Sequence, residues 1–297
     1  MPTLSRRDVL ETLLGAAALA HLPDTASAQR PTPGPAERWR QLPATPPLPA
    51  PNHSALVPSN EASVFVAEYG TGDAVLMLHG GLGSSNYYAH QIVALALRHR
   101  VIAIDTRGHG RSPYSGSKLT YDLFARDALA VMDHLKLDTA AAVGWSDGGV
   151  TALQLAMTAP DRVTRAFVFG ANADPSGYIP NGASRSAVFK QYVDRCRAEY
   201  ASLSPRPDRF DRLLVELRRM WLSEPQFTKN MLRKVRVPVT VTLGEFDEII
   251  KPNHAAYMAA AMPGGKSIVL PRVSHFAMIQ DPASFNQALD DFLRPAT

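Results

Sequence analysis

The sequence predicts an α/β fold: a mostly parallel β-sheet with helices on both faces and a helical lid inserted over one edge. Two observations predict it. Strand patterns and helix patterns alternate along most of the 297 residues, as they do when crossover helices connect parallel strands. One long stretch, residues 172–236, breaks this alternation and contains helical patterns but no strand pattern. A single α/β domain of this length is common.

Composition agrees with an ordinary globular protein, since 45% of the residues are hydrophobic and 20% are charged. The net charge of +4 is spread along the chain without a basic run, which argues against a nucleic-acid partner. A single cysteine, Cys196, excludes an intrachain disulfide and a cysteine-based zinc site. We expect it to be an inert thiol on a helix. No metal motif or phosphate loop is evident, so we predict no cofactor.

Residues 1–28 resemble a twin-arginine export signal. Arg6 and Arg7 come first, an apolar stretch rich in small residues follows, and a small-x-small tripeptide ends at Ala28. The apolar stretch is short and contains Glu11, so no stable membrane span is expected. The alternative is an amphipathic helix that begins the fold. We expect export, with a periplasmic or secreted mature protein.

Prolines crowd residues 29–58, and proline lacks the backbone N–H that helices and sheets need to propagate. This segment is therefore expected to be an extended tether that can wrap on the surface. The core is expected to consist of residues 59–171 and 237–297, and the lid of residues 172–236.

The first half of the core alternates in order. The β-rich segment SVFVAEY predicts a strand at 63–69, and the nearly continuous apolar run AVLMLHG predicts a doubly buried strand at 74–80. Helical spacing follows over 87–99, and RVIAID predicts the next strand at 100–105.

An amphipathic helix is predicted at 120–135, because Leu123, Val131 and Leu135 fall on one side of it. The remaining predicted strands and helices alternate in the same way. Strands are predicted at 140–145, 163–171, 237–245 and 266–271, and helices at 149–159, 253–262 and 282–293.

The lid contains helical patterns at 183–202 and 208–221, separated by prolines, and is too long to be a simple connection. Ligands bind such sheets outside the carboxyl ends of the strands. A lid over that edge would shape the substrate site and exclude water.

The motif Gly144-x-Ser146-x-Gly148 lies between the strand 140–145 and the helix 149–159. This context is typical of a nucleophile elbow, a sharp turn that strains the serine and lifts its Oγ above the sheet. The turn needs small residues two positions away on either side. Ser146 is therefore the predicted nucleophile; the alternative is a polar residue in a tight turn.

A serine nucleophile needs a base and an acid that orients the base, expected in the chain order Ser, Asp or Glu, His. Two histidines follow the serine, His254 and His275. His275 comes just after the strand 266–271 and is the predicted base, whereas His254 opens a helix. Asp247 follows the strand 237–245 and is the predicted acid. Its neighbours Glu245 and Glu248 are expected to be solvated or structural.

The oxyanion hole is expected to use two backbone N–H groups. One belongs to Asp147, at the start of a helix whose dipole favours negative charge. The other comes from HGGLGSS, where glycines let the backbone approach a substrate; Gly81 is the predicted donor and Leu82 the alternative. Leu82 is also a candidate substrate contact. His79 is expected to shape this loop by hydrogen bonds.

The motif DTRGHGRS follows the strand 100–105. We interpret it as a structural turn in which Asp105 and Arg107 pair locally. His109 is not expected to be catalytic.

Residues 60–295 resemble the α/β-hydrolase superfamily in the order, spacing and context of these motifs. The segments VGWSDGGVTALQLAMTAPDRV and FVFGANA, with Trp221 late in the lid, resemble the valacyclovir-hydrolase (biphenyl-hydrolase-like) group. That group hydrolyses α-amino-acid esters, and the resemblance implies that Asp147 contacts a substrate ammonium and that Trp221 lies at the substrate. The chain departs from the group in its export signal and tether. An alternative for Asp147 is an acid placed favourably at a helix N-terminus.

The sequence thus predicts an exported serine hydrolase of small-molecule carboxylic esters, with α-amino-acid esters as one option. Enol-lactonase, C–C hydrolase and cofactor-free haloperoxidase activities remain alternatives, because they use the same three residues. A protein that binds a small ligand without turnover is a further alternative.

Overall fold

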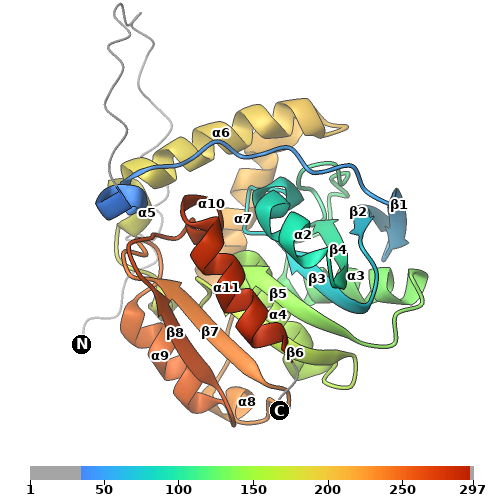
Figure 1. Ribbon diagram of the computed structural model, residues 1–297. Helices are drawn as coiled ribbons and strands as arrows, with labels where there is room; N and C mark the ends of the chain where they lie inside the picture. Colours follow the sequence, from blue (N-terminus) through green and yellow to red (C-terminus); the bar gives the residue numbers. More distant parts are fainter. Residues whose placement is uncertain (1–34, 295–297) are drawn as a thin grey trace, which may run out of the picture.

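The computed structural model describes residues 35–294, which form one eight-stranded sheet with helices on both faces (Figure 1). The strand order is β1-β2-β4-β3-β5-β6-β7-β8. The pairs β1–β2 and β2–β4 are antiparallel, and all the others are parallel. The strands are β1 His53–Ser59, β2 Ala62–Tyr69, β3 Asp73–Leu78, β4 His99–Asp105, β5 Ala140–Trp145, β6 Val163–Phe169, β7 Val239–Gly244 and β8 Lys266–Leu270.

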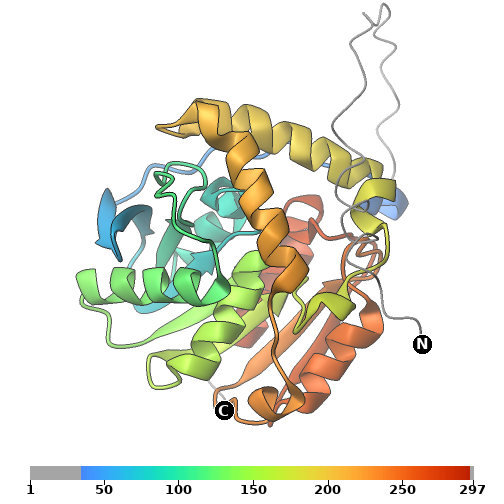
Figure 2. The same cartoon turned by 180° about the vertical axis from the view of Figure 1, so that it is seen from behind.

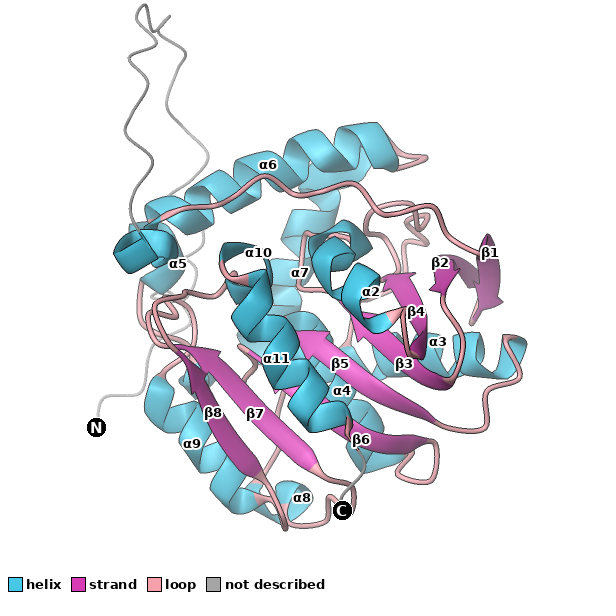
Figure 3. Cartoon of the chain, viewed as in Figure 1, coloured by secondary structure: helices cyan, strands magenta, loops and turns pink. Residues whose placement is uncertain are grey.

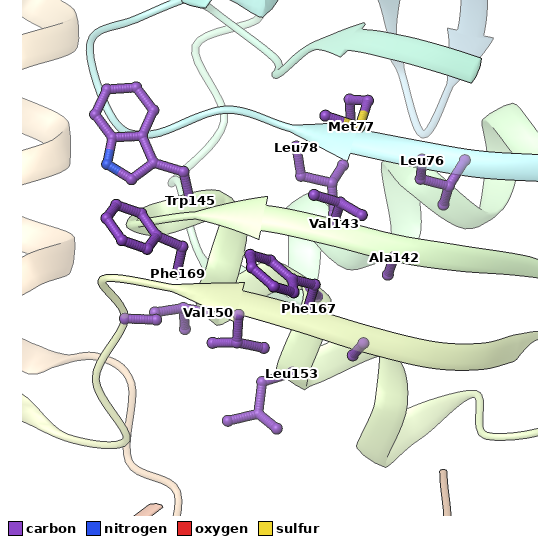
Figure 4. Packing of buried hydrophobic residues seen from close by; sticks show 14 of the residues in the cluster. Leu76, Met77, Leu78, Ala142, Val143, Trp145, Val150, Leu153, Phe167 and Phe169 are labelled. Carbon is purple, nitrogen blue, oxygen red and sulfur yellow. The ribbon is translucent and has the colours of Figure 1, made fainter. Parts of the chain in front are cut away.

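Helices α2 (Ala89–Leu95) and α11 (Pro282–Leu293) cover one face of the sheet, and α3 (Tyr121–His134), α4 (Asp147–Thr158) and α9 (Pro252–Ala261) cover the other (Figures 1 and 2). Every residue of β5 and β7 is buried. Burial on both faces explains why these strands are apolar without alternation. Figure 4 shows part of the core, where side chains of β3, β5, β6 and α4 gather.

The helical insertion lies above the carboxyl ends of the strands, as expected for a lid (Figure 2). Its longest helices are α6 (Ala187–Leu203) and α7 (Phe210–Ser223). The shorter helices of the insertion are η3 Pro175–Gly177, α5 Gly182–Arg185, η4 Pro207–Arg209 and α8 Lys229–Leu232. The remaining described helices are η1 Pro35–Arg40, η2 Ser85–Tyr88 and α10 Ala277–Gln280.

The proline-rich segment differs in part from its prediction. It was expected to contain neither helix nor strand, yet it holds η1 at Pro35–Arg40 and its end belongs to β1. β1 is an edge strand that pairs only with β2, and Pro58 lies opposite Ser63. Proline is tolerated there because an edge strand needs only half of its ladder hydrogen bonds. Between η1 and β1 the chain is extended and runs alongside α6 (Figure 3).

Several predicted boundaries were also wrong, and the strand expected over 74–80, for example, ends at Leu78. The helix expected over 87–99 ends at Leu95, because the chain must turn before β4 begins at His99. The strand expected over 163–171 ends at Phe169, since Gly170 adopts a positive φ of 61°. The predicted export signal, residues 1–28, lies outside the described residues. Within residues 35–294, no helix combines the length and apolarity that a bilayer crossing requires.

The predicted local pair of Asp105 and Arg107 does not form. Arg107 is fully buried and makes a two-pronged ion pair with Asp127 of α3, with Nε–Oδ2 at 2.7 Å and Nη2–Oδ1 at 2.5 Å. Asp105 instead accepts hydrogen bonds from the backbone and hydroxyl of Ser85 and pairs with Arg111 at 3.0 Å. Asp105 is thus held by η2 and by another residue of its own turn, whereas Arg107 reaches α3. The sequence spacing did not reveal this division.

Candidate active site

Ser146 lies at the junction of β5 and α4, in a strained backbone conformation. Its φ of 53° and ψ of −118° are far from the regions that residues with a Cβ usually occupy. The turn is closed by glycines: a Cβ on Gly144 would lie 2.0 Å from the carbonyl oxygen of Gly148, and a Cβ on Gly148 would lie 1.9 Å from that of Leu78. The backbone N–H of Ser146 donates to the Phe169 carbonyl at 2.8 Å, which ties the turn to β6.

The side chain of Ser146 does not cap helix α4. Ser146 occupies the N-cap position of α4, where a serine side chain ordinarily accepts a hydrogen bond from the first turn, but it makes no such bond. The alternative of a polar residue that stabilises a turn therefore has no contact to support it. The strained backbone favours the interpretation as a nucleophile, because strain of this kind is concentrated at functional sites.

Asp247 and His275 lie at the carboxyl ends of β7 and β8 and are hydrogen-bonded to each other, with His275 Nδ1 2.8 Å from Asp247 Oδ2. Both residues are buried. The other carboxylate oxygen of Asp247 accepts the N–H groups of Ile249 and Ile250 at 2.9 and 2.8 Å. These bonds fix the carboxylate, which in turn orients the imidazole.

The imidazole of His275 lies beside the elbow. Its ring centroid is 5.9 Å from that of Trp145, which precedes Ser146, and 6.4 Å from that of Phe169. Burial disfavours the charged imidazolium, but the Asp247 carboxylate, helped by Glu248 and Asp147, outweighs burial and raises the pKa of His275 above 6.5. A histidine in this setting is suited to accept a proton near neutral pH.

The loop that carries His275 has further supports that the sequence analysis did not identify. Glu248 accepts the backbone N–H of His275 at 3.1 Å, so it is structural, one of the two roles expected for it. The side chain of Gln280 accepts the N–H of Ser274 at 2.7 Å and donates to its hydroxyl at 3.0 Å. No sequence signal marks Gln280, because its partners depend on how the loop folds back. Glu245 accepts the N–H of Arg272 at 2.8 Å.

The rejected histidine, His254, lies in α9 and accepts the N–H of Ala173 through Nε2 at 3.0 Å. It therefore supports the start of the lid segment. His79 shapes its loop as predicted, since Nδ1 lies 2.8 Å from the Gly80 carbonyl and Nε2 accepts the N–H of Thr106 at 2.9 Å. His109 is buried, which lowers its pKa to about 3. Cys196 is a buried thiol on α6, and burial raises its pKa.

Gly81 and Asp147, the predicted oxyanion donors, lie against each other. A Cβ on Gly81 would lie 2.4 Å from Asp147 Oδ2 and 2.7 Å from Cζ2 of Trp221. Asp147 is the first residue of α4, so its backbone N–H belongs to the group that a helix leaves without an intrahelical partner. The carbonyl of Gly81 is held by the hydroxyl of Tyr192, a residue of α6, at 2.6 Å. Leu82 is buried with a φ of 69°.

The Asp147 carboxylate is buried and held by neutral donors. Tyr121 donates its hydroxyl to Oδ1 at 2.8 Å, and Trp221 Nε1 lies 2.9 Å from both carboxylate oxygens. Burial raises the pKa of Asp147 to about 6, although the two hydrogen bonds and His275 oppose the rise. The sequence predicted Trp221 near the substrate but missed Tyr121, whose position depends on how α3 packs against α4.

A metal centre is not formed in the described part of the chain: within residues 35–294 no group of three or more His, Cys, Asp or Glu side chains is arranged to hold an ion.

Comparison with known proteins adds family context. Residues 73–198 match the family model of the alpha/beta hydrolase fold. Serine hydrolase BPHL of Homo sapiens is 29% identical over 255 residues, covering 81% of this chain and 86% of the relative. The 2-hydroxy-6-oxo-6-phenylhexa-2,4-dienoate hydrolase of Burkholderia cepacia is 26% identical over 260 residues, covering 77% and 91%. A solved structure described as Est816, an N-acyl homoserine lactone degrading enzyme, is 25% identical with a TM-score of 0.65, covering 80% and 100%.

Proposed function

Because the chain is an α/β-hydrolase that resembles Serine hydrolase BPHL and the biphenyl-type hydrolases, we propose that it cleaves carboxylic esters through a serine acyl-enzyme. The observation that carries the proposal is the hydrogen bond between His275 and Asp247 beside a strained Ser146. A serine nucleophile needs a base beside it and an acid that orients the base, and this arrangement provides both.

In the proposed reaction, Ser146 Oγ attacks the ester carbonyl while Nε2 of His275 takes the hydroxyl proton. Asp247 holds the imidazole through Nδ1 and stabilises its charged form. The backbone N–H groups of Asp147 and Gly81 stabilise the oxyanion. His275 then returns the proton to the leaving alcohol, and a water molecule, activated by the same imidazole, releases the acid and regenerates Ser146.

The Asp147 carboxylate favours α-amino-acid esters within this class. A carboxylate about 6 Å from a developing oxyanion repels it by roughly 2–3 kcal/mol at an effective dielectric constant near 20. The contacts of Asp147 with Tyr121 and Trp221 supply hydrogen bonds but no positive charge. A substrate ammonium would compensate both the repulsion and the burial of the carboxylate. With a pKa of about 6, Asp147 is mainly ionised at pH 7 and able to attract that ammonium.

Other reactions of the same three residues remain candidates, since the relatives include a C–C bond hydrolase, a lactone-degrading enzyme and a non-heme haloperoxidase. A panel of substrates separates them. We expect multiple turnover on short-chain chromogenic esters and complete loss in Ser146→Ala. Turnover only on a vinylogous diketone or a lactone, with none on open-chain esters, would overturn the ester assignment. Stoichiometric binding without turnover would indicate a ligand-binding protein.

The amino-acid preference is tested with aminoacyl and neutral esters matched for size. In Asp147→Asn we expect kcat/KM for the aminoacyl ester to fall at least tenfold. We expect kcat/KM for the neutral ester not to fall, because the variant also loses the repulsion between the carboxylate and the oxyanion. Asparagine is a matched replacement because its Oδ1 can still accept from Tyr121 and Trp221. Equal losses on both esters would remove the ammonium role and leave the triad assignment untouched.

Export is also part of the proposal. Its support is the order of features in residues 1–28, with Arg6 and Arg7 ahead of an apolar stretch and a small-x-small tripeptide at Ala28. Expression in a bacterium with fractionation should find a shortened chain that begins at Gln29 outside the cytoplasm. Replacing both arginines with lysine should leave the full-length protein inside. Export that is insensitive to this double change would contradict the twin-arginine route.

A further inference from the structure

Residues 38–45, which we call the strap, contact both the lid and the loops that carry Asp247 and His275. The strap begins in η1 and continues as extended chain alongside α6 (Figure 1). It lies outside the 73–198 segment that matches the hydrolase family model. Its contacts reach three places that the proposed reaction depends on.

The first contact is with the loop of the catalytic acid. The indole of Trp39 stacks on Phe246, with ring centroids 4.7 Å apart and planes inclined by 24°. Phe246 directly precedes Asp247, and its backbone N–H donates to the Val273 carbonyl at 3.0 Å. The stacked ring therefore covers a point where the Asp247 loop and the His275 loop are joined.

The second contact is with the loop of the catalytic base. Gln280 donates through Nε2 to the Gln41 carbonyl at 2.8 Å and to the hydroxyl of Ser274 at 3.0 Å. Its Oε1 accepts the backbone N–H of Ser274 at 2.7 Å. Because Ser274 precedes His275, one buried amide side chain connects the strap backbone to the residue beside the imidazole.

The third contact is with the lid. Arg195 of α6 donates to the carbonyl of Leu42 at 2.7 Å and to that of Pro43. Leu42 is itself buried in the core cluster. One turn earlier on α6, Tyr192 donates to the carbonyl of Gly81 at 2.6 Å. The strap therefore anchors the helix that holds the predicted oxyanion loop.

We propose that the strap is a positioning element for catalysis. It holds the His275 loop through Gln280 and Trp39, and it holds the Gly81 loop through Arg195 and α6. The inference rests on the proposed ester hydrolysis for its kinetic readout. A displacement of about 1 Å in a catalytic group can cost roughly a hundredfold in rate. Loosening the strap should therefore lower kcat, because the groups that move stabilise the transition state more than the bound ester.

The test uses the full chain with Arg195→Ala and Trp39→Ala, assayed on a neutral ester. We expect kcat to fall about tenfold or more in each, with KM within about twofold of the parent. Trp39→Phe keeps a ring on Phe246 and should stay within about twofold of the parent kcat. Arg165→Ala is the matched control, because Arg165 also donates to two carbonyls, those of Phe292 and Arg294, both at 2.7 Å. It lies near the amino end of β6, away from the carboxyl ends of the strands where Asp247 and His275 lie.

Amide hydrogen exchange supplies a readout that needs no substrate. Arg195→Ala and Trp39→Ala should exchange faster than the parent at residues 79–85 and 272–276, and Arg165→Ala should not. Parental kcat in both strap variants would overturn the inference, and so would an equal loss in Arg165→Ala. If the parent hydrolysed no ester, the proposed function would fail, and the exchange experiment would decide the inference by itself.

Discussion

Trp221 Nε1 lies 2.9 Å from both carboxylate oxygens of Asp147, so a residue of the lid is bonded to the residue that follows the predicted nucleophile. This contact links the lid to the first residue of α4, next to Ser146. It also lowers the pKa of a carboxylate that burial otherwise raises.

Replacing Trp221 with phenylalanine should alter selectivity more than catalysis. The variant loses a hydrogen bond to a charged group, worth about 1.5–3 kcal/mol, and the pKa of Asp147 rises because one donor is gone. That energy corresponds to about 1–2 pKa units, so at pH 7 the ionised fraction of Asp147 falls. The value of kcat/KM for an aminoacyl ester should therefore fall about twofold to tenfold, while that for a neutral ester changes little. Parallel steady-state assays check this. Tyr121→Phe should act in the same direction, and opposite effects of the two variants would contradict the explanation.

The dependence of kcat/KM on pH should follow the ionisation of His275. The base must be neutral to accept the Ser146 proton, and Asp247 raises the pKa of the imidazole above 6.5. We therefore expect kcat/KM for a neutral ester to rise with pH and to reach half its plateau above pH 6.5. Asp247→Asn should lower kcat by about 10⁴-fold. A flat profile between pH 5 and 8 would exclude His275 as the base.

Asp147 should make the fold less stable as pH rises. Its pKa is about 6 in the folded protein against an ordinary value of 3.8, so the protonated form is favoured by folding. That contribution is complete below pH 3.8 and is lost as pH rises through 6, for a total of about 3 kcal/mol. The free energy of unfolding, measured in urea at pH 4.5 and 7.5, should be higher for Asp147→Asn relative to the wild type at pH 7.5 than at pH 4.5. An unchanged difference at the two pH values would contradict the raised pKa.

Gly170→Ala should damage catalysis through His275. A Cβ at this position would lie 2.8 Å from Cε1 and 2.9 Å from Nδ1 of His275, and φ is 61°. A displaced imidazole should lower kcat by roughly a hundredfold. Gly264→Ala is a matched control, since φ is 70° but a new Cβ meets nothing within 4 Å. Both variants should lose similar backbone stability, about 1 kcal/mol; similar kinetics in the two would show that the Gly170 contact is unimportant.

The amino-acid sequence alone was enough to predict seven of the eight strands, all but β1, and the placement of Ser146, Asp247 and His275 after three of them. It could do so because buried parallel strands are continuously apolar, and because their carboxyl ends meet at one edge of a sheet. Residues that follow these strands are brought close together whatever the details of packing.

The partners of Arg107, Tyr121 and Gln280 became known only from the folded protein. Arg107 pairs with Asp127 instead of Asp105, Tyr121 reaches Asp147, and Gln280 connects the strap to the His275 loop. Each contact joins segments far apart in the chain, and each donor could have bonded to many acceptors. Which partner a side chain meets depends on the angle at which its helix or loop packs. The hydrophobic periodicity of the sequence shows which face of an element is buried but not this angle.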